Sequence, residues 1–253
     1  MAAPTLAEHL AQRPFALALS SGFFGFYAHA GVVLALEEAG LVPARLSGSS
    51  AGALVAGLVG AGVPARVIVD EVIALRRADF WDPAPGLGLL RGARFRQLVE
   101  RIAPVTRLEA CPRPVAISAF DLGRRCTVVL RDGELATAIT ASCAFPGLLQ
   151  PVRRDGRLLS DGGIGDRPGV AGLADGPADE PVLSHPGAAA AVAATPLAGA
   201  LRIAPRAATV TLRVLGLPRL HPLRLGPGAA AVERAHAATR WALAQPVAAQ
   251  LDA

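Results

Sequence analysis

Short apolar runs alternate with segments of helical periodicity through the first half of the chain. The run FALALS over residues 15–20 precedes a helical pattern over residues 27–40. The strand pattern VPARLSGSS then precedes a helical run of small residues, AGALVAGLVGAG. Strands that alternate with helices are typical of a layered α/β fold whose strands run parallel. We therefore expect an α/β fold with a largely parallel central sheet.

The same patterns predict the later elements. Val32, Val33, Leu36 and Ala39 define one apolar face of the helix over residues 27–40, and Gly40 ends it. Further helices are expected over residues 64–77, 93–103, 134–142 and 228–245, and strands over residues 114–121 and 126–133 and in the stretches EPVLSHP and ATVTLRVLG. The Ala-rich residues 187–205 are compatible with a helix, a flap or a lid.

Composition limits the class of protein. The 253 residues are 52% hydrophobic and 18% charged, which indicates one globular domain over residues 1–253. The formal net charge is +5, and every cationic side chain apart from histidine is arginine. This balance would favour anionic surfaces such as phospholipid head groups. The arginines, however, are scattered along the sequence without interleaved aromatic residues, so we expect no nucleic-acid partner.

Cysteine usage and the N-terminal residues bear on the compartment. The three cysteines, Cys111, Cys126 and Cys143, are odd in number and lack metal-ligand spacing, which favours a reducing compartment. The apolar run after Arg13 resembles a signal peptide only in part, because serines and glycines interrupt it. We expect a cytoplasmic protein without a transmembrane segment, and contact with a membrane surface is a hypothesis.

A turn of small residues separates the second predicted strand from the helix that follows it. It contains Gly48, Ser50 and Gly52 in the pattern G-x-S-x-G, in which the glycines let another backbone come close to the serine. The free N–H groups at the start of the helix would face an oxyanion formed at Ser50. By itself the pattern fits a structural turn as well as a nucleophile. Its early position disfavours a Ser–Asp–His triad with His185 or His221.

Four blocks in the same order resemble the patatin-like phospholipase family. They are LALSSGFFGFYAHAGVVLALEEAGL, LSGSSAGAL, ITASCAFPGLLQPV and GRLLSDGGIGDRP. The resemblance spans residues 15–170, and residues 171–253 form a divergent part of the same expected domain. It implies a three-layer fold with helices flanking the sheet.

The family resemblance also implies a chemistry. Ser50 and Asp161 would form a dyad that hydrolyses acyl esters of lipids, with no cofactor and no metal. The backbone N–H groups of Gly22, Phe23 and Ala51 would hold the oxyanion. Gly162 and Gly163 would leave room for the serine turn beside the carboxylate. Without the resemblance, Asp161 would be interpreted as an ordinary Asp-Gly turn residue.

The chain departs from the family pattern in the loop after the first strand. The family runs G-G-G-x-Arg/Lys-G there, whereas this chain has SGFFGF over Ser21–Phe26, with Phe23 for a glycine and Gly25 for the basic residue. The aromatic residues of this loop fit an acyl-chain pocket or, more simply, the core.

Three further residues near these blocks are expected to have structural roles. Asp166 is expected in an exposed loop, while His29 is expected to pack or hydrogen-bond on the first long helix. Cys143 is expected to be a small buried residue.

Two functions of different classes follow. The first is a serine acyl hydrolase acting on a lipid or another acyl ester, of the phospholipase A or lysophospholipase type. The alternative is a weakened or inactive module that binds lipids or acyl groups through the altered loop. The sequence indicates neither the particular ester nor an oligomeric state.

Overall fold

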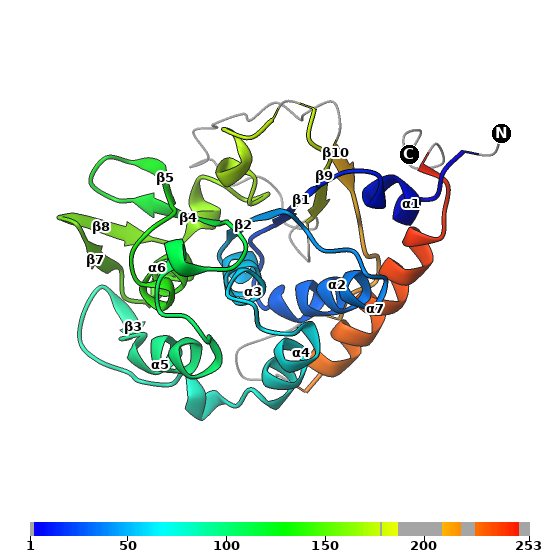
Figure 1. Cartoon of the computed structure of the whole chain (residues 1–253). Coiled ribbons are helices and arrows are strands. Elements are labelled where there is room, and N and C mark those ends of the chain that lie inside the picture. Colours follow the sequence, from blue (N-terminus) through cyan, green and yellow to red (C-terminus); the bar gives the residue numbers. More distant parts are fainter. Residues whose placement is uncertain (1–2, 178, 187–208, 219–225, 248–253) are drawn as a thin grey trace.

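The computed structural model describes residues 3–177, 179–186, 209–218 and 226–247. Figure 1 shows a sheet through the middle of the molecule with long helices packed along one of its faces. The Ala-rich residues 187–205 lie outside the described residues, so the interpretation of them as a helix, flap or lid stays a prediction.

Five parallel strands form the centre of the sheet. Its order is β10-β9-β1-β2-β4-β8-β7, and β10, β9, β1, β2 and β4 pair parallel to one another. Their bounds are β1 Ala16–Leu19, β2 Arg45–Ser49, β4 Val115–Asp121, β9 Val182–His185 and β10 Thr209–Thr211. A strand covered on both faces is apolar throughout, which explains why all four residues of β1 are buried. The expected largely parallel sheet is confirmed.

The other end of the sheet is antiparallel. Strands β5 (Cys126–Leu130) and β8 (Arg157–Ser160) both pair with β4, and β7 (Val152–Arg154) pairs with β8. A separate two-stranded sheet joins β3 (Gly88–Leu90) to β6 (Gly147–Leu149). The sequence analysis predicted β5 but not β3, β6, β7 or β8, because three or four residues show too little periodicity.

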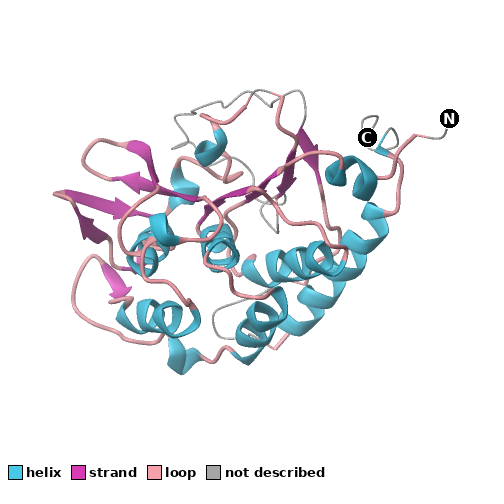
Figure 2. Cartoon of the chain, viewed as in Figure 1, coloured by secondary structure: helices cyan, strands magenta, loops and turns pink. Residues whose placement is uncertain are grey.

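Helices cover one face of the sheet and a short 3₁₀ turn covers the other (Figure 2). Leu17 and Leu19 of β1 join the large core beneath the helices, while Ala16 and Ala18 pack with Leu173 on the opposite face. The α-helices are α1 Leu6–Ala11, α2 Phe26–Glu38, α3 Ala51–Gly60, α4 Ala65–Ala74, α5 Ala93–Ile102, α6 Leu135–Ser142 and α7 Gly228–Leu243. The 3₁₀ turns are η1 Arg77–Asp79, η2 Leu108–Ala110, η3 Gly162–Ile164 and η4 Ala171–Leu173.

Helix α2 is buried on every side, not along one face. Val32, Val33 and Leu36 are buried as expected, but Ala39 is exposed at the helix end. All residues from Tyr27 to Leu36 are buried because α2 lies between the sheet and helix α7, which runs beside it in Figure 1. A sequence read alone cannot show that a distant C-terminal helix will cover the second face.

No helix in the described ranges is long and apolar enough to cross a membrane. Cys111, Cys126 and Cys143 are all free thiols.

Gly31 sets how closely α2 and α7 can approach. A Cβ at this position would collide with the Val232 carbonyl oxygen and lie 2.9 Å from the His236 backbone nitrogen. We expect Gly31→Ala to lower the free energy of unfolding by about 1–3 kcal/mol, because the two backbones must separate. Urea denaturation measures the effect. Gly226→Ala is the matched control, since a Cβ there meets nothing within 4 Å; equal stability of the two variants would contradict the proposed packing.

Candidate active site

Ser50 stands between strand β2 and helix α3 in a strained backbone conformation. Its φ is 51° and its ψ is −118°, in a region that residues other than glycine rarely adopt. The Ser50 N–H donates to the Ser142 hydroxyl at 2.8 Å. Its carbonyl accepts from the N–H groups of Ala53 and Leu54 in the first turn of α3. These bonds hold the turn so that the side chain points away from both elements.

Gly48 and Gly52 permit the close packing of this turn. A Cβ at Gly48 would collide with the Gly52 carbonyl, and a Cβ at Gly52 would collide with the Leu19 carbonyl at the end of β1. The Gly52 N–H also donates to the Ser20 carbonyl at 3.1 Å. The serine turn therefore touches the loop that follows β1 backbone to backbone.

Asp161 reaches Ser50 from the antiparallel side of the sheet. It directly follows β8, which is separated from β2 by β4 alone. The Ser50 hydroxyl donates to Asp161 Oδ2 at 2.7 Å, and the Gly163 N–H donates to Oδ1 at 2.8 Å. The structure thus brings together the two side chains that the sequence analysis paired, and no third side chain stands between them.

Burial changes the basicity of Asp161. Asp161 is only 5% exposed, and the loss of hydration raises the pKa of its carboxyl group to about 6. The hydrogen bonds from Ser50 and Gly163 lower this pKa, but by less than burial raises it. The carboxylate is therefore still ionised at neutral pH, yet it is a stronger base than a solvated aspartate. This combination suits a group that accepts a proton from an alcohol.

Gly162 and Gly163 pack the aspartate loop against the serine turn and the loop after β1. A Cβ at Gly162 would collide with the Ser118 carbonyl and lie 2.7 Å from Ser49 Oγ. A Cβ at Gly163 would lie 2.7 Å from Ser21 Oγ. Neither position has room for a side chain, as the sequence analysis expected.

The loop after β1 presents unused backbone donors. Within the described residues, the N–H groups of Gly22, Phe23 and Ala51 have no hydrogen-bond acceptor. Gly25 N–H closes a turn onto the Gly22 carbonyl at 2.8 Å, and Phe24 has a positive φ of 57°. Donors without partners beside a nucleophile are what an oxyanion site requires.

The aromatic residues of this loop divide between the two expected roles. Tyr27 is buried, and Phe24 and Phe26 pack against the main core. Phe23 is 46% exposed, and its ring centroid lies 5.8 Å from that of Phe145 in an edge-on contact. Phe23 is the exposed member of this group, while Phe24 and Phe26 are half-buried.

The expectation for Asp166 is wrong. Asp166 is buried, not exposed, and its carboxylate accepts from the Ser118 hydroxyl at 2.6 Å and from the backbone N–H groups of Val170 and Ala171. These three bonds compensate for lost hydration and fasten the loop after η3 to strand β4. An isolated loop sequence does not reveal a partner on a strand 48 residues away.

Ser142 is a site residue that the sequence analysis missed. Its hydroxyl accepts from Ser50 N–H and donates to the Ser118 carbonyl at 2.6 Å, so it links the serine turn to β4. It lies within the block ITASCAFPG, which the sequence analysis used only to recognise the family. The neighbouring Cys143 thiol donates to the Ser50 carbonyl at 3.2 Å. Burial, followed by the nearby Asp161 charge, raises the Cys143 pKa well above its usual value, so the thiol stays neutral.

The two buried histidines do not contact the Ser50 side chain. His29 Nε2 donates to the Ser20 carbonyl at 2.9 Å, and His185 Nδ1 donates to the Leu212 carbonyl at 3.0 Å. Burial lowers the pKa of His29 to about 3 and that of His185 to about 4, so both rings are neutral. His29 thus has the hydrogen-bonding role expected for it, while His221 lies outside the described residues.

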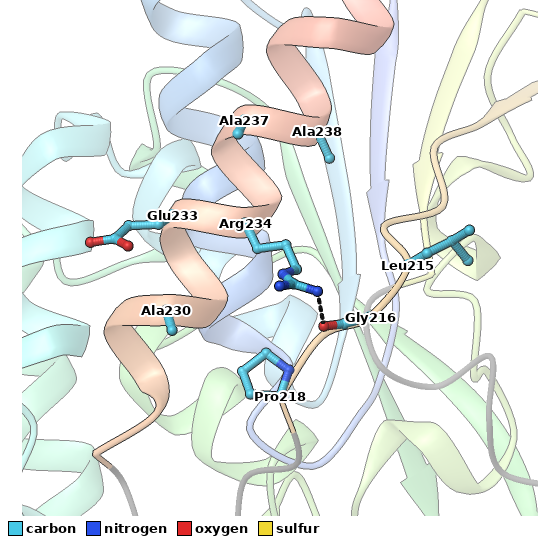
Figure 3. A pocket seen from close by; sticks show the side chains of 8 residues that line it. All are labelled: Leu215, Gly216, Pro218, Ala230, Glu233, Arg234, Ala237 and Ala238. Atoms are coloured by element: carbon cyan, nitrogen blue, oxygen red, sulfur yellow. Dashed lines mark hydrogen bonds between the residues drawn. The ribbon is translucent and has the colours of Figure 1, made fainter.

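A pocket away from Ser50 lies beside α7. Figure 3 shows its lining, with Ala230 and Arg234 on the helix facing Leu215 and Gly216 of the segment after β10. Its volume is about 650 Å³, and Arg234 donates to the Gly216 carbonyl at 2.6 Å. None of the site residues above lines it.

Comparisons with known proteins identify the family of this chain. The sequence profile of the family described as patatin-like phospholipase matches residues 17–174. An uncharacterized NTE family protein of Mycobacterium tuberculosis is 38% identical over 170 residues, covering 65% of this chain and 46% of that protein. Lysophospholipase nte1 of Emericella nidulans is 28% identical over 173 residues, covering 66% of this chain and 11% of that protein.

A solved structure has the same fold. VipD from Legionella pneumophila superposes with a TM-score of 0.63 at 15% identity, covering 91% of this chain and 66% of that one. The chain spans about half the length of the mycobacterial relative.

Loss of the Ser142 hydroxyl should disturb Ser50 without unfolding the protein. Ser142→Ala leaves the Ser50 N–H buried without its acceptor, so we expect Ser50 to react about tenfold more slowly with a fluorophosphonate probe. Thr140→Val on the same helix is the matched control, because the Thr140 hydroxyl bonds only within α6. Equal labelling rates in both variants would show that the Ser142 hydroxyl does not hold the serine turn in place.

The raised pKa of Asp161 should make the ionised side chain a cost to stability. The pKa of Asp161 is about 6 in the folded chain and 3.8 as a free group. The free energy of unfolding should therefore fall by about 3 kcal/mol as the pH rises from below 4 through 6. We expect Asp161→Asn to exceed wild type in urea resistance at pH 8, with the difference shrinking toward pH 4. Asp70→Asn, exposed on α4, is the control; a pH-independent difference for Asp161→Asn would contradict the assignment.

Proposed function

Because this chain belongs to the patatin-like phospholipase family, we propose that it is a serine acyl hydrolase that cleaves lipid esters through Ser50 and Asp161. The observation that carries the proposal is the 2.7 Å hydrogen bond from the Ser50 hydroxyl to a buried carboxylate. Membership in the patatin-like phospholipase family supports a phospholipid substrate, and the name of the fungal relative, a lysophospholipase, supports one with a single acyl chain.

The first half of the reaction forms an acyl-enzyme. Ser50 Oγ attacks the ester carbonyl carbon while its proton passes to Asp161 Oδ2. The carbonyl oxygen becomes an oxyanion and accepts from the N–H groups of Gly22, Phe23 and Ala51. Loss of one such donor typically costs about a hundredfold or more in rate. When the intermediate collapses, the bond to the leaving alcohol breaks, and Asp161 returns the proton to that alcohol.

The second half releases the acid. A water molecule takes the place of the alcohol and gives a proton to Asp161 as its oxygen attacks the acyl carbon. The tetrahedral intermediate then expels Ser50 Oγ, which recovers the proton from Asp161. One ester and one water become one acid and one alcohol, and the dyad ends in its starting state.

The loop after β1 departs from the family pattern, and this departure favours one alternative to the hydrolase. Phe23 and Gly25 stand where the family has a glycine and a basic residue, which is the basis for a lipid- or acyl-binding module with weakened catalysis. Backbone donors do not depend on the side chain, so we place the hydrolase first. Covalent labelling of Ser50 by a fluorophosphonate distinguishes the two, because a binding module would hold lipid without being labelled.

Removing either member of the dyad should abolish hydrolysis. We expect Ser50→Ala and Asp161→Asn to lower kcat for a soluble nitrophenyl ester by a factor of about a thousand or more, with folding preserved. Ser47→Ala is the matched control, because the Ser47 hydroxyl is buried in β2 without a hydrogen-bond partner. Equal rates in all four proteins would end the proposal.

The pH dependence of the reaction should report Asp161. Only the ionised carboxylate accepts a proton, so kcat/KM should fall about tenfold for each pH unit below the pKa of about 6. The same limb should appear with nitrophenyl esters of different chain length, since it belongs to the free enzyme. Activity that stays level down to pH 4 would show that another group is the base.

A further inference from the structure

Four exposed apolar side chains, here called the apolar patch, lie on segments that the β3–β6 pairing and one aromatic contact connect. Leu87 is 72% exposed, Leu89 51%, Phe145 48% and Phe23 46%. Leu87 and Leu89 flank Gly88, which pairs with Gly147, two residues after Phe145. Phe145 in turn contacts Phe23. The pairing of β3 with β6 therefore connects Leu87 and Leu89, here called the apolar tip, to the segment that carries Phe145.

This patch borders the candidate active site. Phe145 follows Ala144, whose carbonyl accepts the Asp161 N–H at 3.0 Å. Phe23 belongs to the loop whose N–H groups lack acceptors. The two exposed rings therefore lie on the segments that hold Asp161 and carry the unused N–H groups.

Four arginines flank the apolar tip in the sequence. Arg76 and Arg77 precede it and Arg91 and Arg94 follow it; all are exposed, and none forms an ion pair with a carboxylate in the described part of the chain. The Arg94 guanidinium donates to the Ala78 carbonyl at 2.8 Å, which draws the two flanks together. This bond brings the segment before the tip and the segment after it together.

The acidic residues of this segment form no ion pair with these arginines, and four arginines with two aspartates leave residues 76–94 a net charge of +2. Asp79 accepts the backbone N–H of Arg76, and Asp82 accepts those of Gly92 and Arg94. Both carboxylates therefore serve the local backbone. Arg77 lies over the Trp81 ring at 3.8 Å, and an indole beside cations is suited to the boundary between lipid head groups and acyl chains.

We propose that residues 76–94, together with Phe23 and Phe145, form a docking face that seats on an anionic phospholipid bilayer. Leu87 and Leu89 enter the acyl region while the four guanidinium groups bind lipid phosphates. Free phosphate would satisfy the arginines but not the leucines. The proposal deepens the proposed function by naming the surface on which Ser50 meets its substrate, and vesicle binding tests it independently of hydrolysis.

Location supports a membrane as the occupant. Figure 1 places β3 and the loop before it at the end of the molecule opposite α7 and the two termini. A chain seated on this end would turn Leu87 and Leu89 toward the lipid, and Phe145 with Phe23 would connect them to the segment that binds the Asp161 N–H.

Co-sedimentation with ether-linked phospholipid vesicles tests the proposal, because ether lipids resist an ester hydrolase. Wild type should bind vesicles of phosphatidylcholine and phosphatidylglycerol, with weaker binding to phosphatidylcholine alone and a loss of affinity in high salt. Leu87→Asp with Leu89→Asp should weaken binding about tenfold or more. Arg76→Gln and Arg91→Gln should each weaken binding about fivefold.

Matched controls lie at the other end of the molecule. Leu215→Asp and Arg213→Gln change an exposed leucine and an exposed arginine beside α7, and they should leave vesicle binding unchanged. The Leu87 and Leu89 double variant should also unfold in urea at the wild-type midpoint, which shows, independently of hydrolysis, that it folds.

Several results would overturn the docking face. The first is equal binding to neutral and anionic vesicles, and the second is unchanged binding by the double variant. The third is an equal loss of binding in the Leu215 control. The fourth is displacement of the protein from vesicles by RNA together with unchanged affinity when the leucines are replaced. A protein that binds these vesicles as expected but hydrolyses no ester would refute the proposed function and leave the docking face standing.

Discussion

The hydrogen bond between the Ser50 hydroxyl and the Asp161 carboxylate joins residues 111 positions apart. It forms because three neighbouring strands, β2, β4 and β8, end near the same place, so that the serine turn after β2 and the aspartate loop after β8 meet. The meeting requires backbones to touch. Gly52 lies against the end of β1, Gly162 lies against β4, and a single added carbon at either position would collide with a carbonyl.

Several features near this contact lower the free energy of unfolding. Ser50 and Phe24 both have positive φ, and the ionised Asp161 is buried at the expense of its hydration. The surrounding structure holds these groups in place through specific bonds: Ser142 binds the Ser50 N–H, and Asp166 fastens the loop beyond η3 to β4. A strained residue and a carboxylate of raised basicity, held by a rigid sheet, are common features of sites prepared for chemistry.

How much of the structure the sequence predicts depends on how far apart along the chain the interacting residues lie. The strands β1, β2, β4, β5, β9 and β10 and the helices α2 to α7 were predicted from local patterns of apolar residues. The pairing of Ser50 with Asp161 was predicted only through resemblance to a family, because an Asp-Gly-Gly stretch looks like an ordinary turn. Asp166 was predicted on the surface and is buried, since its partner Ser118 lies on a distant strand. Ser142 was not singled out, because a serine at the end of a helix has no pattern that marks it as a support.

Local residue order determined the elements of this protein, the serine turn and the small residues that such a turn needs, because periodicity and steric size act between near neighbours. The tertiary structure alone decided which carboxylate is buried beside Ser50, which faces of α2 are covered, and that the two arginine-bearing segments before and after Leu87 and Leu89 meet. Burial, basicity and surface charge depend on what the rest of the chain brings into contact. A segment read alone does not contain that information.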